Sequence, residues 1–485
     1  MGAVTFQIDS PGNHMSTHEQ SSGLVAESLR NDPRVAEAKR LLLEAVKDHS
    51  SQLDTVKSGS ETLAEPYQKL LDEYGQMRGG NLYFPYLGSG IGNGPFVELG
   101  NGSVKLDFIT GIGVHGFGHS DPRIVEAGID AALNDTVMHG NLQQGTISYD
   151  FVKSMLSIAN QSGAGLDHCF LTTSGAMANE NALKIAFQKH APATRTLSFE
   201  KCFAGRTLAL AQVTDKAKYR DGIPKAIDVD LIPFFDHQDP QGSTRRCVQA
   251  IRHHAHRFPG QHANLWLELV QGEGGYYPGS KEFFRAIITE AKKHDMAIIA
   301  DEVQSFSRTT RPFAFQHFEL DDLVDIVTVG KITQVCCTIY RDSYKPRPGL
   351  ISQTFTGSSW AMLAGKAIIE GLVDSGHYGP EGKNVKLHDH FVAGIKRIES
   401  RFPGSLKGPY GIGGMVAFTP FKGSFEEAKD LVLKMYHRGL LSFMAGGNPT
   451  RVRFLMPLGC TTEAHIDQAL QILESCVEEM AETAK

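Results

Sequence analysis

The sequence has no long apolar run, no excess of basic residues and no paired cysteine motif. No run of about 18 apolar residues is present, so a membrane span is not expected. The 48 basic and 54 acidic residues give a net charge of −6, which offers no footprint for nucleic acid or anionic lipid. The seven cysteines are scattered without a C-x-x-C motif. This argues against a disulfide framework or a zinc site and fits a reducing compartment.

What is present is a long chain of ordinary globular composition. Its 485 residues allow roughly two to four domains with a large buried core. Residues 1–22 are polar and include Asp9 and Glu19, so they do not resemble a secretory signal. We expect a loose tail there, and a cytoplasmic protein.

Strand-like and helix-like segments alternate along the middle of the chain, from about residue 121 to 340. Such alternation predicts βαβ units and an α/β fold with a mostly parallel sheet covered by helices. The strand-like stretches are 169–172, 265–270, 296–300 and 325–329, and the helix-like ones are 177–190 and 281–294.

The two ends of the chain follow other patterns. Residues 32–78 are expected to be helical, and residues 96–99 and 104–108 to form a hairpin. After residue 382, helices and strands indicate a smaller α+β domain. We therefore expect an N-terminal helical extension and segment packing with the small domain, a large domain and a small C-terminal domain, over residues 1–118, 119–382 and 383–485.

An apolar stretch over residues 297–300 ends in the acid Asp301. In doubly wound sheets, ligands bind outside the carboxyl ends of the strands. The Asp301 carboxylate is therefore a candidate ligand contact, and a cap of the following loop is an equally good interpretation.

Lys331 follows a second apolar stretch, 325–329, and one glycine. Burial there would lower the pKa of the lysine and make its amine a better nucleophile. The alternative is a solvated loop lysine, which is the commoner fate of a single lysine.

Ser174-Gly175-Ala176 connects the strand at 169–172 to the helix expected from residue 177. Free N–H groups at a helix start suit a phosphate, and glycine lets the anion approach closely. The alternative is that Ser174 is only an N-cap.

Two further patterns are given other interpretations. Residues 111–116 read G-x-G-x-x-G, but no helix opens directly after them. We interpret them as a glycine-lined loop near a ligand rather than a dinucleotide site. A histidine cluster lacks an accompanying set of cysteines or acids, so a solvated helix end is favoured and no metal site is predicted; its members are His253, His254, His256 and His262.

A helix-start anion site, a strand-end acid and a lysine after the next strand form a meaningful set. Pyridoxal 5'-phosphate chemistry requires a phosphate cradle, a counter-charge for the ring nitrogen and an amine for the Schiff base. The combination favours an enzyme of this type.

From about residue 97 to the C-terminus, the sequence resembles the class III (ω-amino-acid) aminotransferases, a fold-type-I pyridoxal-phosphate family. The segments that carry the resemblance occur in the family's order. They are TSGAMANENA (173–182), FAGRT (203–207), VQGEGGY (270–276), ADEVQ (300–304), DIVTVGK (325–331) and RVRF (451–454).

The resemblance implies a role for individual residues. Lys331 would form the Schiff base and shuttle a proton, and Asp301 would keep the ring nitrogen protonated. The other residues implied to contact the cofactor hold its phosphate or its ring: Ser174, Gly175 and Ala176 for the phosphate, Phe203 and Val303 for the ring faces, and Gln304 for the phenolic oxygen.

The resemblance also implies how substrate is bound and how subunits associate. Arg453 would bind a substrate carboxylate, and Glu273 would pair with that arginine when an amine end is admitted. Thr354 would reach the phosphate of a neighbouring subunit, which implies a homodimer with shared active sites.

Two branches of the family share features with this chain. TQVC at 333–336 matches lysine 6-aminotransferases, whereas VMHGNL at 137–142 looks more like acetylornithine aminotransferases. The chain departs from the family at one position and in one segment: Ala204 stands where histidine is usual, and residues 332–337 lack the usual glycine-rich run.

The expected function is transfer of the terminal amine of an ω-amino or diamino acid to a 2-oxo acid, with 2-oxoglutarate as the expected acceptor. The donor would be of the lysine, ornithine, acetylornithine or 4-aminobutyrate type. The alternatives are another class III chemistry, a decarboxylase or an aminomutase, and a catalytically degenerate relative that acts as a binding subunit.

Overall fold

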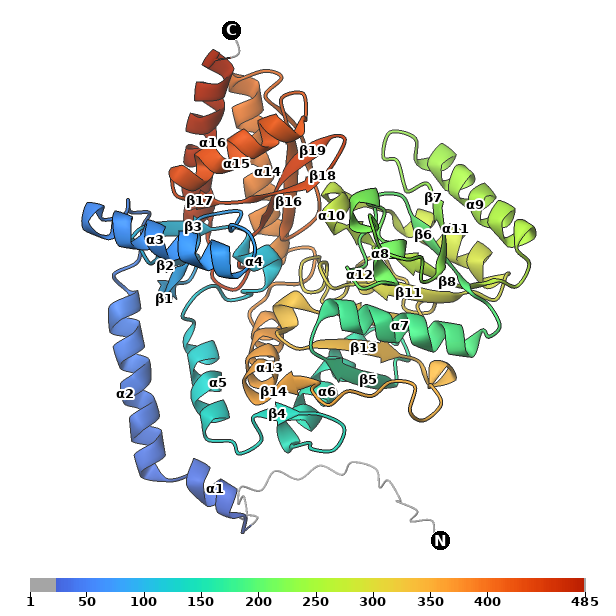
Figure 1. Cartoon of the computed structure of the whole chain (residues 1–485), viewed down its shortest axis with the longest axis horizontal. Coiled ribbons are helices and arrows are strands. Elements are labelled where there is room, and N and C mark those ends of the chain that lie inside the picture. Colours follow the sequence, from blue (N-terminus) through green and yellow to red (C-terminus); the bar gives the residue numbers. More distant parts are fainter. Residues whose placement is uncertain (1–22, 484–485) are drawn as a thin grey trace.

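The computed structural model describes residues 23–483, and the tail expected at residues 1–22 lies outside them. A seven-stranded sheet forms the centre, in the order β5-β13-β12-β11-β8-β6-β7 (Figure 1). All its strands run parallel except β13, which is antiparallel to both neighbours. The strands are β5 (His168–Thr172), β6 (Arg195–Phe199), β7 (Asp228–Ile232), β8 (His262–Leu267), β11 (Ala297–Asp301), β12 (Ile326–Val329) and β13 (Cys336–Tyr340).

The central strands are apolar on both faces because helices cover both faces. In β11, Ala297 and Ile299 belong to the same buried cluster as α7 (Gly175–Lys189). Ile298 and Ala300 instead belong to the cluster of α11 (Lys281–Lys292). The period-two alternation of a strand thus divides four consecutive apolar residues between two helical layers. The mostly parallel α/β sheet expected from the sequence is confirmed.

Further helices surround this sheet. α11 packs beside α9, and α13 packs against α5 and α6. The ranges of these and the shorter helices are α5 (Pro122–Ala132), α6 (Thr146–Ala159), α8 (Leu210–Val213), α9 (Pro240–Arg257), α10 (Gly272–Gly275), α12 (Ala314–His317) and α13 (Ser359–Asp374). Short strands β4 (Met138–His139) and β14 (Gly357–Ser358) pair with each other, as do β9 (Val270–Gln271) and β10 (Tyr277–Pro278).

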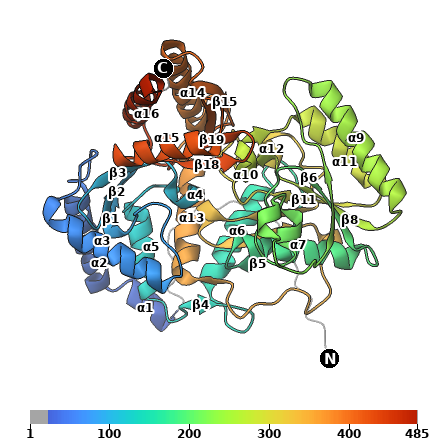
Figure 2. The same cartoon turned by 45° about the horizontal axis from the view of Figure 1, so that its top comes forward.

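The C-terminal elements form a second sheet with its own helices, seen at the top of Figure 1 and turned forward in Figure 2. The sheet order is β15-β16-β19-β18, and the helices pack against it and each other. The elements are α14 (Lys383–Arg401), β15 (Leu406–Tyr410), β16 (Met415–Pro420), α15 (Phe425–His437), β18 (Phe443–Gly446), β19 (Thr450–Leu455) and α16 (Glu463–Thr483).

Strands from the N-terminal region join these C-terminal elements. β3 pairs in parallel with β17, with Leu106 opposite Leu440. Phe108, next to β3, is fully buried in the same cluster as Phe391 and Phe454. The strands of this sheet are β1 (Gly88–Asn93), β2 (Phe96–Leu99), β3 (Val104–Asp107) and β17 (Leu440–Leu441), so the hairpin expected at 96–108 is confirmed.

The helical region expected over residues 32–78 contains two helices with a non-helical stretch between them. Three helices precede β1, namely α1 (Val25–Arg30), α2 (Pro33–Ser50) and α3 (Glu61–Met77). Between the last two, Leu53 is buried and Lys57 exchanges backbone hydrogen bonds with Val104 of β3. Tertiary pairing therefore replaces helical hydrogen bonds at this point.

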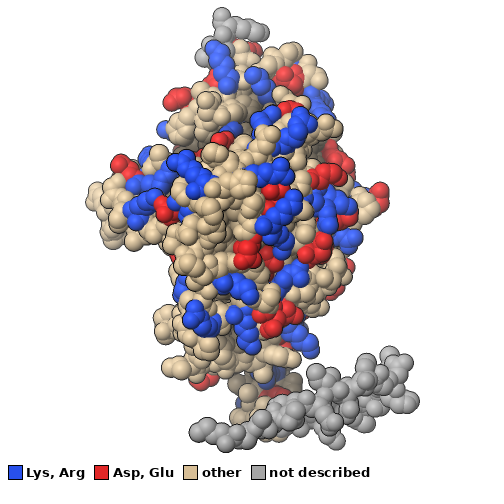
Figure 3. All heavy atoms as spheres, turned by 90° about the vertical axis from the view of Figure 1, so that its right-hand side faces the viewer, with Lys and Arg blue, Asp and Glu red and all other residues tan. Residues whose placement is uncertain are grey.

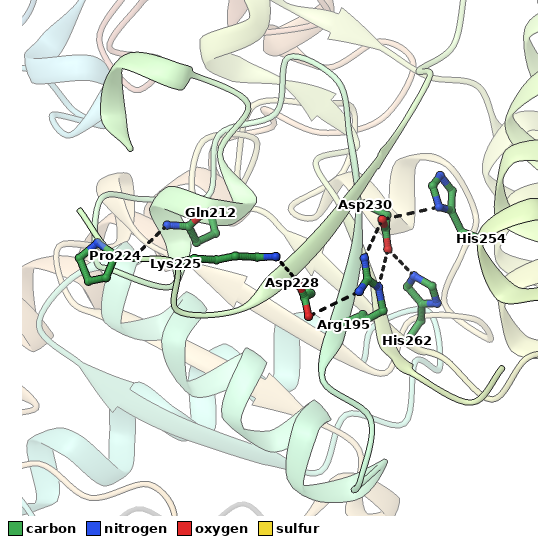
Figure 4. A network of polar contacts seen from close by, with 8 residues as sticks. All are labelled: Arg195, Gln212, Pro224, Lys225, Asp228, Asp230, His254 and His262. Atoms are coloured by element: carbon green, nitrogen blue, oxygen red, sulfur yellow. Dashed lines mark hydrogen bonds and ion pairs between the residues drawn. The ribbon is translucent and has the colours of Figure 1, made fainter. Parts of the chain in front are cut away.

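The histidine cluster is only partly the solvated helix end that the sequence suggests. His253 and His256 are exposed, but His262 is buried and its Nε2 lies 2.8 Å from Asp230 Oδ2. Figure 4 shows Asp230 also facing His254 and accepting two hydrogen bonds from Arg195. Asp230 belongs to β7, whereas His262 belongs to β8. The spacing of the histidines in the sequence therefore does not reveal this acidic partner.

The surface shows no single sign of charge on the face drawn in Figure 3. Basic and acidic side chains are interspersed there, as expected for a chain of small net charge. Within residues 23–483, no helix is both long enough and apolar enough to cross a bilayer.

Candidate active site

Lys331 and Asp301 lie at the same edge of the central sheet. In the register of β11 and β12, Asp301 is opposite Thr328, and Lys331 follows three residues later. Lys331 adopts the left-handed region, with a φ of 56°, a strained conformation that clusters at functional sites. Burial lowers the pKa of Lys331, and the nearby acids Glu273 and Asp301 oppose this only in part.

The Asp301 carboxylate is almost fully buried and held by two donors. Oδ1 accepts from the backbone N–H of Val303 at 3.0 Å, and Oδ2 accepts from Asn179 Nδ2 at 2.7 Å. Burial raises the pKa of Asp301 to about 6, although both hydrogen bonds favour the charged form. The Asp301 carboxylate thus faces a specific buried partner and does not merely cap the next loop.

Asn179 was not assigned a role from the sequence. Its amide also donates to the carbonyl of Ala204 at 2.7 Å, so one buried side chain ties Asp301 to the segment after Phe203. The signal was available, because Asn179 lies within the TSGAMANENA segment on the first turns of α7.

The start of α7 has the features of an anion site. Ser174 is its N-cap, and its Oγ accepts from the N–H of Met177 at 3.2 Å. The N–H groups of Gly175 and Ala176 have no acceptor among the described residues. A Cβ added at Gly175 would lie 2.8 Å from Val303 Cγ1, so a larger residue would close this approach.

The same region brings the lysine loop to the helix start. A Cβ built on Gly330 would lie 3.3 Å from Val303 Cγ1 and 3.6 Å from the Cα of Gly175. The residue before Lys331 is thus in contact distance of both Val303 and the start of α7. Residues far apart in sequence, near 175, 303 and 331, form one site.

Arg453 closes the site from β19 and is fully buried. Its Nη2 lies 2.6 Å from Glu273 Oε1, and its Nη1 lies 3.2 Å from Gln304 Oε1. Burial alone would raise the pKa of Glu273, but the Arg453 guanidinium holds it below its usual range. The arginine is therefore neutralised by an acid of its own chain in this conformation.

Glu268 is a second buried acid that sequence reasoning missed. It accepts hydrogen bonds from the N–H groups of Phe203 at 2.8 Å and Gly272 at 3.0 Å. Burial, with the nearby charge of Asp301, raises the pKa of Glu268 to about 8. The sequence does contain a signal for Glu268, because this acid directly follows the apolar strand β8.

Thr354 is not joined to this group. It is exposed, and no hydrogen bond described in residues 23–483 connects it to the residues around Lys331. Its carbonyl lies against Gly140, where an added Cβ would come within 1.7 Å.

The residues fit pyridoxal 5'-phosphate on three observations. The start of α7 offers unpaired N–H groups beside a close-packed glycine. The buried Asp301 carboxylate lies at the end of β11, and Lys331, whose pKa is lowered, follows the neighbouring strand β12. These groups, on a mostly parallel mixed sheet covered by helices, define a fold-type-I pyridoxal-phosphate enzyme.

Comparison with known proteins identifies the family within this class of enzymes. Residues 89–477 match the model of the family "Aminotransferase class-III", and the chain belongs to this family. It is a transaminase that uses pyridoxal phosphate.

Curated relatives agree with this assignment. The acetylornithine aminotransferase of Archaeoglobus fulgidus is 30% identical, and the match covers 79% of this chain and 93% of that protein. The acetylornithine aminotransferase of Bacillus subtilis is 31% identical, with coverage of 79% and 93%.

Solved structures share the fold. Lysine aminotransferase from M. tuberculosis superimposes with a TM-score of 0.75 at 24% identity, covering 84% of this chain and 99% of that one. The ornithine aminotransferase of Toxoplasma gondii gives 0.74 at 21% identity, with coverage of 86% and 96%.

Proposed function

We propose that this transaminase takes the terminal amine of an ω-amino or diamino acid and passes it to a 2-oxo acid, with 2-oxoglutarate as the acceptor. The Glu273–Arg453 ion pair carries this proposal. Because Glu273 neutralises the Arg453 guanidinium, the site does not require a substrate carboxylate next to the carbon that bears the reacting amine. A substrate whose amine stands at the end of an uncharged carbon chain can therefore enter. The names of the relatives, acetylornithine aminotransferases, support donors of this type.

Lys331 and Asp301 are the proposed catalytic residues. Bound pyridoxal phosphate supplies an electron sink for the carbon from which a proton is removed. Lys331 Nζ, with its lowered pKa, accepts and returns that proton. Asp301, fixed by Asn179 and Val303, supplies the negative charge that keeps the ring nitrogen protonated.

The remaining proposed roles concern binding. The α7 macrodipole and its free N–H groups favour a phosphate at Ser174, Gly175 and Ala176. Phe203 and Val303 are proposed to cover the two ring faces, and Gln304 to bond the phenolic oxygen. For the acceptor, Glu273 is proposed to swing away so that Arg453 binds a carboxylate bidentately.

We also propose that the protein is a homodimer with shared active sites, each completed by Thr354 of the other copy. Thr354 is exposed, and large apolar side chains near it are exposed as well, as expected for a face covered by a partner. They are Leu133, Val137, Leu142, Phe355 and Trp360.

Two other proposals concern the chain as a whole. All seven cysteines are unpaired, which supports a reducing compartment and thus a cytoplasmic location. The shared core of β3 with the C-terminal helices supports a division at residues 1–118, 119–382 and 383–485, with part of the first segment packed on the third.

The donor is tested by spectroscopy on the cofactor-loaded protein. Lysine, ornithine, acetylornithine and 4-aminobutyrate are mixed with it separately, without acceptor, and the visible band of the bound cofactor is followed. The proposal expects at least one of them to bleach the band, and 2-oxoglutarate to restore it. Bleaching by 2-amino acids alone would refute terminal-amine specificity, and carbon dioxide release would favour a decarboxylase.

A further inference from the structure

The glycine loop, residues 110–116, opens with the short element α4 (Thr110–Gly113) and has an unusual backbone. Its first four residues have φ values of 50°, 64°, 65° and 78°. Two of them, Thr110 and Ile112, are β-branched, and a positive φ is strained for such residues. Strain of this kind persists only where surrounding groups hold the chain in place.

Two side chains hold the glycine loop, and each comes from a segment of the proposed active site. The Arg308 guanidinium is buried, and it donates to the carbonyl of Gly113 and, at 3.0 Å, to that of Gln304. Gln334 Nε2 donates to the carbonyl of Val114 at 2.8 Å. The loop is thus hydrogen-bonded both to the segment after β11 and to the turn after β12.

The turn after β12 is strained at both of its ends. Lys331 has a φ of 56°, and Gln334 has a φ of 61° with a ψ of −44°. The Gln334 N–H closes the turn by donating to the Lys331 carbonyl at 3.0 Å. Glycine adopts a positive φ without strain, whereas glutamine does so at a cost. The hydrogen bond from the Gln334 side chain to Val114 offsets that cost.

The glycine loop and this turn also touch directly. A Cβ added at Gly116 would lie 2.8 Å from Ile332 Cγ1, so the residue next to Lys331 packs against the loop backbone. Any shift of the loop therefore reaches the turn that presents the lysine.

Gln334 acts on this turn without a charge of its own. The charged groups that act on the Lys331 amine come from other elements, and they stay in place when a neutral residue replaces Gln334. They are Glu273, Asp301, Arg308 and Arg453. A change in the reactivity of the amine would then report its position rather than its charge.

We propose that Gln334 is a positioning residue of this transaminase, which fastens the turn of Lys331 to the glycine loop and so holds the lysine amine in place for reaction. The inference rests on the proposed function, in which the Lys331 amine takes part in the chemistry. A long side chain presents its amine reproducibly only from a fixed backbone, and a misplacement of about 1 Å can lower a rate about a hundredfold.

Attachment of pyridoxal 5'-phosphate to the cofactor-free protein tests the positioning role. The adduct on Lys331 is trapped with borohydride at successive times and quantified by mass spectrometry. In Gln334→Met, which keeps the length of the side chain but lacks the donor, the rate constant should fall roughly ten- to hundredfold. Gln334→Gly should show the same fall, although it relieves the backbone strain. A wild-type rate constant in either variant would overturn the proposal.

Gln316→Met is the matched control. Gln316 is buried, and its Nε2 also donates to a main-chain carbonyl, that of Ile158 at 2.8 Å. This variant should lose stability because that carbonyl loses its donor, but it should keep the wild-type rate constant for attachment. An equal fall in Gln316→Met would show that loss of any such glutamine is enough, and would overturn the assignment to Gln334.

Amide hydrogen exchange of the cofactor-free protein gives a second measurement that does not depend on the cofactor. Loss of the hydrogen bond to Val114 should speed exchange in the peptide spanning residues 108–118 by about three- to tenfold in both Gln334 variants. Gln316→Met should leave this peptide unchanged. If the wild type attaches the cofactor to another lysine, the proposed function fails, and the exchange rates still decide whether Gln334 holds the loop. Unchanged exchange in both Gln334 variants would refute it.

Discussion

At the scale of single residues, the site depends on the Asp301 carboxylate, whose burial lowers the stability of the folded protein. Asp301 is fixed by Asn179 and Val303, but burial still raises its pKa to about 6 from 3.8. Between those pH values the folded chain holds the proton more tightly than the unfolded chain. The charged carboxylate therefore destabilises the cofactor-free protein above about pH 6, and this penalty is absent below about pH 4.

Asp301→Asn should consequently separate stability from activity. The cofactor-free variant should be more stable than wild type by about 1–3 kcal/mol near neutral pH, with the gain shrinking toward about pH 4. Its transaminase rate should fall by about 100-fold or more, since the counter-charge is lost. Urea unfolding at several pH values and steady-state kinetics measure both effects.

Glu302→Gln is the control for this comparison. Glu302 is also buried with a raised pKa, about 7, but it accepts from the N–H groups of Ala314 and Phe315. By the same reasoning the variant should also gain stability near neutral pH, but it should keep its rate per folded molecule. A stability difference for Asp301→Asn that does not vary with pH would contradict the account.

A second residue-scale prediction concerns the Glu273–Arg453 pair. Glu273→Gln leaves the arginine charged and without its acid, so the half-reaction with ω-amino donors should slow relative to that with glutamate. The ratio of the two rate constants, measured by stopped-flow absorbance, should shift toward glutamate by roughly tenfold. An unchanged ratio would remove the gating role from Glu273.

At the scale of elements, the sequence predicts the parts of the site that are local to one strand end or helix start. The apolar runs before Asp301 and Lys331 predicted buried strands ending at one edge, and β11 and β12 are adjacent. The antiparallel β13 could not be foreseen, because pairing order depends on tertiary contacts. The partners of Asn179 and Glu268 also lie on other elements, so the local sequence signal at each residue does not reveal its contacts.

Asp230 illustrates such a contact between elements. It joins Arg195 of β6, His262 of β8 and His254 of α9 (Figure 4). Burial would raise its pKa, but Arg195 and His262 lower it to about 2. Its contribution to stability is therefore present above about pH 4 and is lost as the pH falls through about 2.

Asp230→Asn should lower the free energy of unfolding by about 1–3 kcal/mol at neutral pH, because buried donors lose a charged acceptor. The deficit should hold down to about pH 4 and shrink below it. Urea unfolding measures it, with the exposed Asp221→Asn as control. A loss of activity per folded molecule would argue against a purely structural role.

At the scale of the whole molecule, the exposed apolar side chains near Thr354 define the surface that a second copy would cover. Phe355 and Trp360 are each 56% exposed, and exposed apolar surface of this kind marks interaction sites on soluble proteins. The helices before β1 and the first described residues precede the matched family segment, which begins at residue 89.

Phe355→Asp should convert the proposed dimer to monomer and lower activity with it, since a buried charge opposes association. Light scattering after size exclusion gives the mass. Phe425→Asp, on the equally exposed start of α15, should leave both mass and activity unchanged. A wild-type protein that is monomeric at micromolar concentration would refute the shared-site proposal.

The central claim is that the cofactor is attached to the amine of Lys331, opposite Asp301. Borohydride reduction of the cofactor-loaded protein, followed by proteolysis and mass spectrometry, tests it most directly. The account predicts a pyridoxyl-phosphate adduct on the peptide containing Lys331, absent in Lys331→Ala together with the visible band. An adduct on any other lysine, or a reduced protein without one, would contradict it.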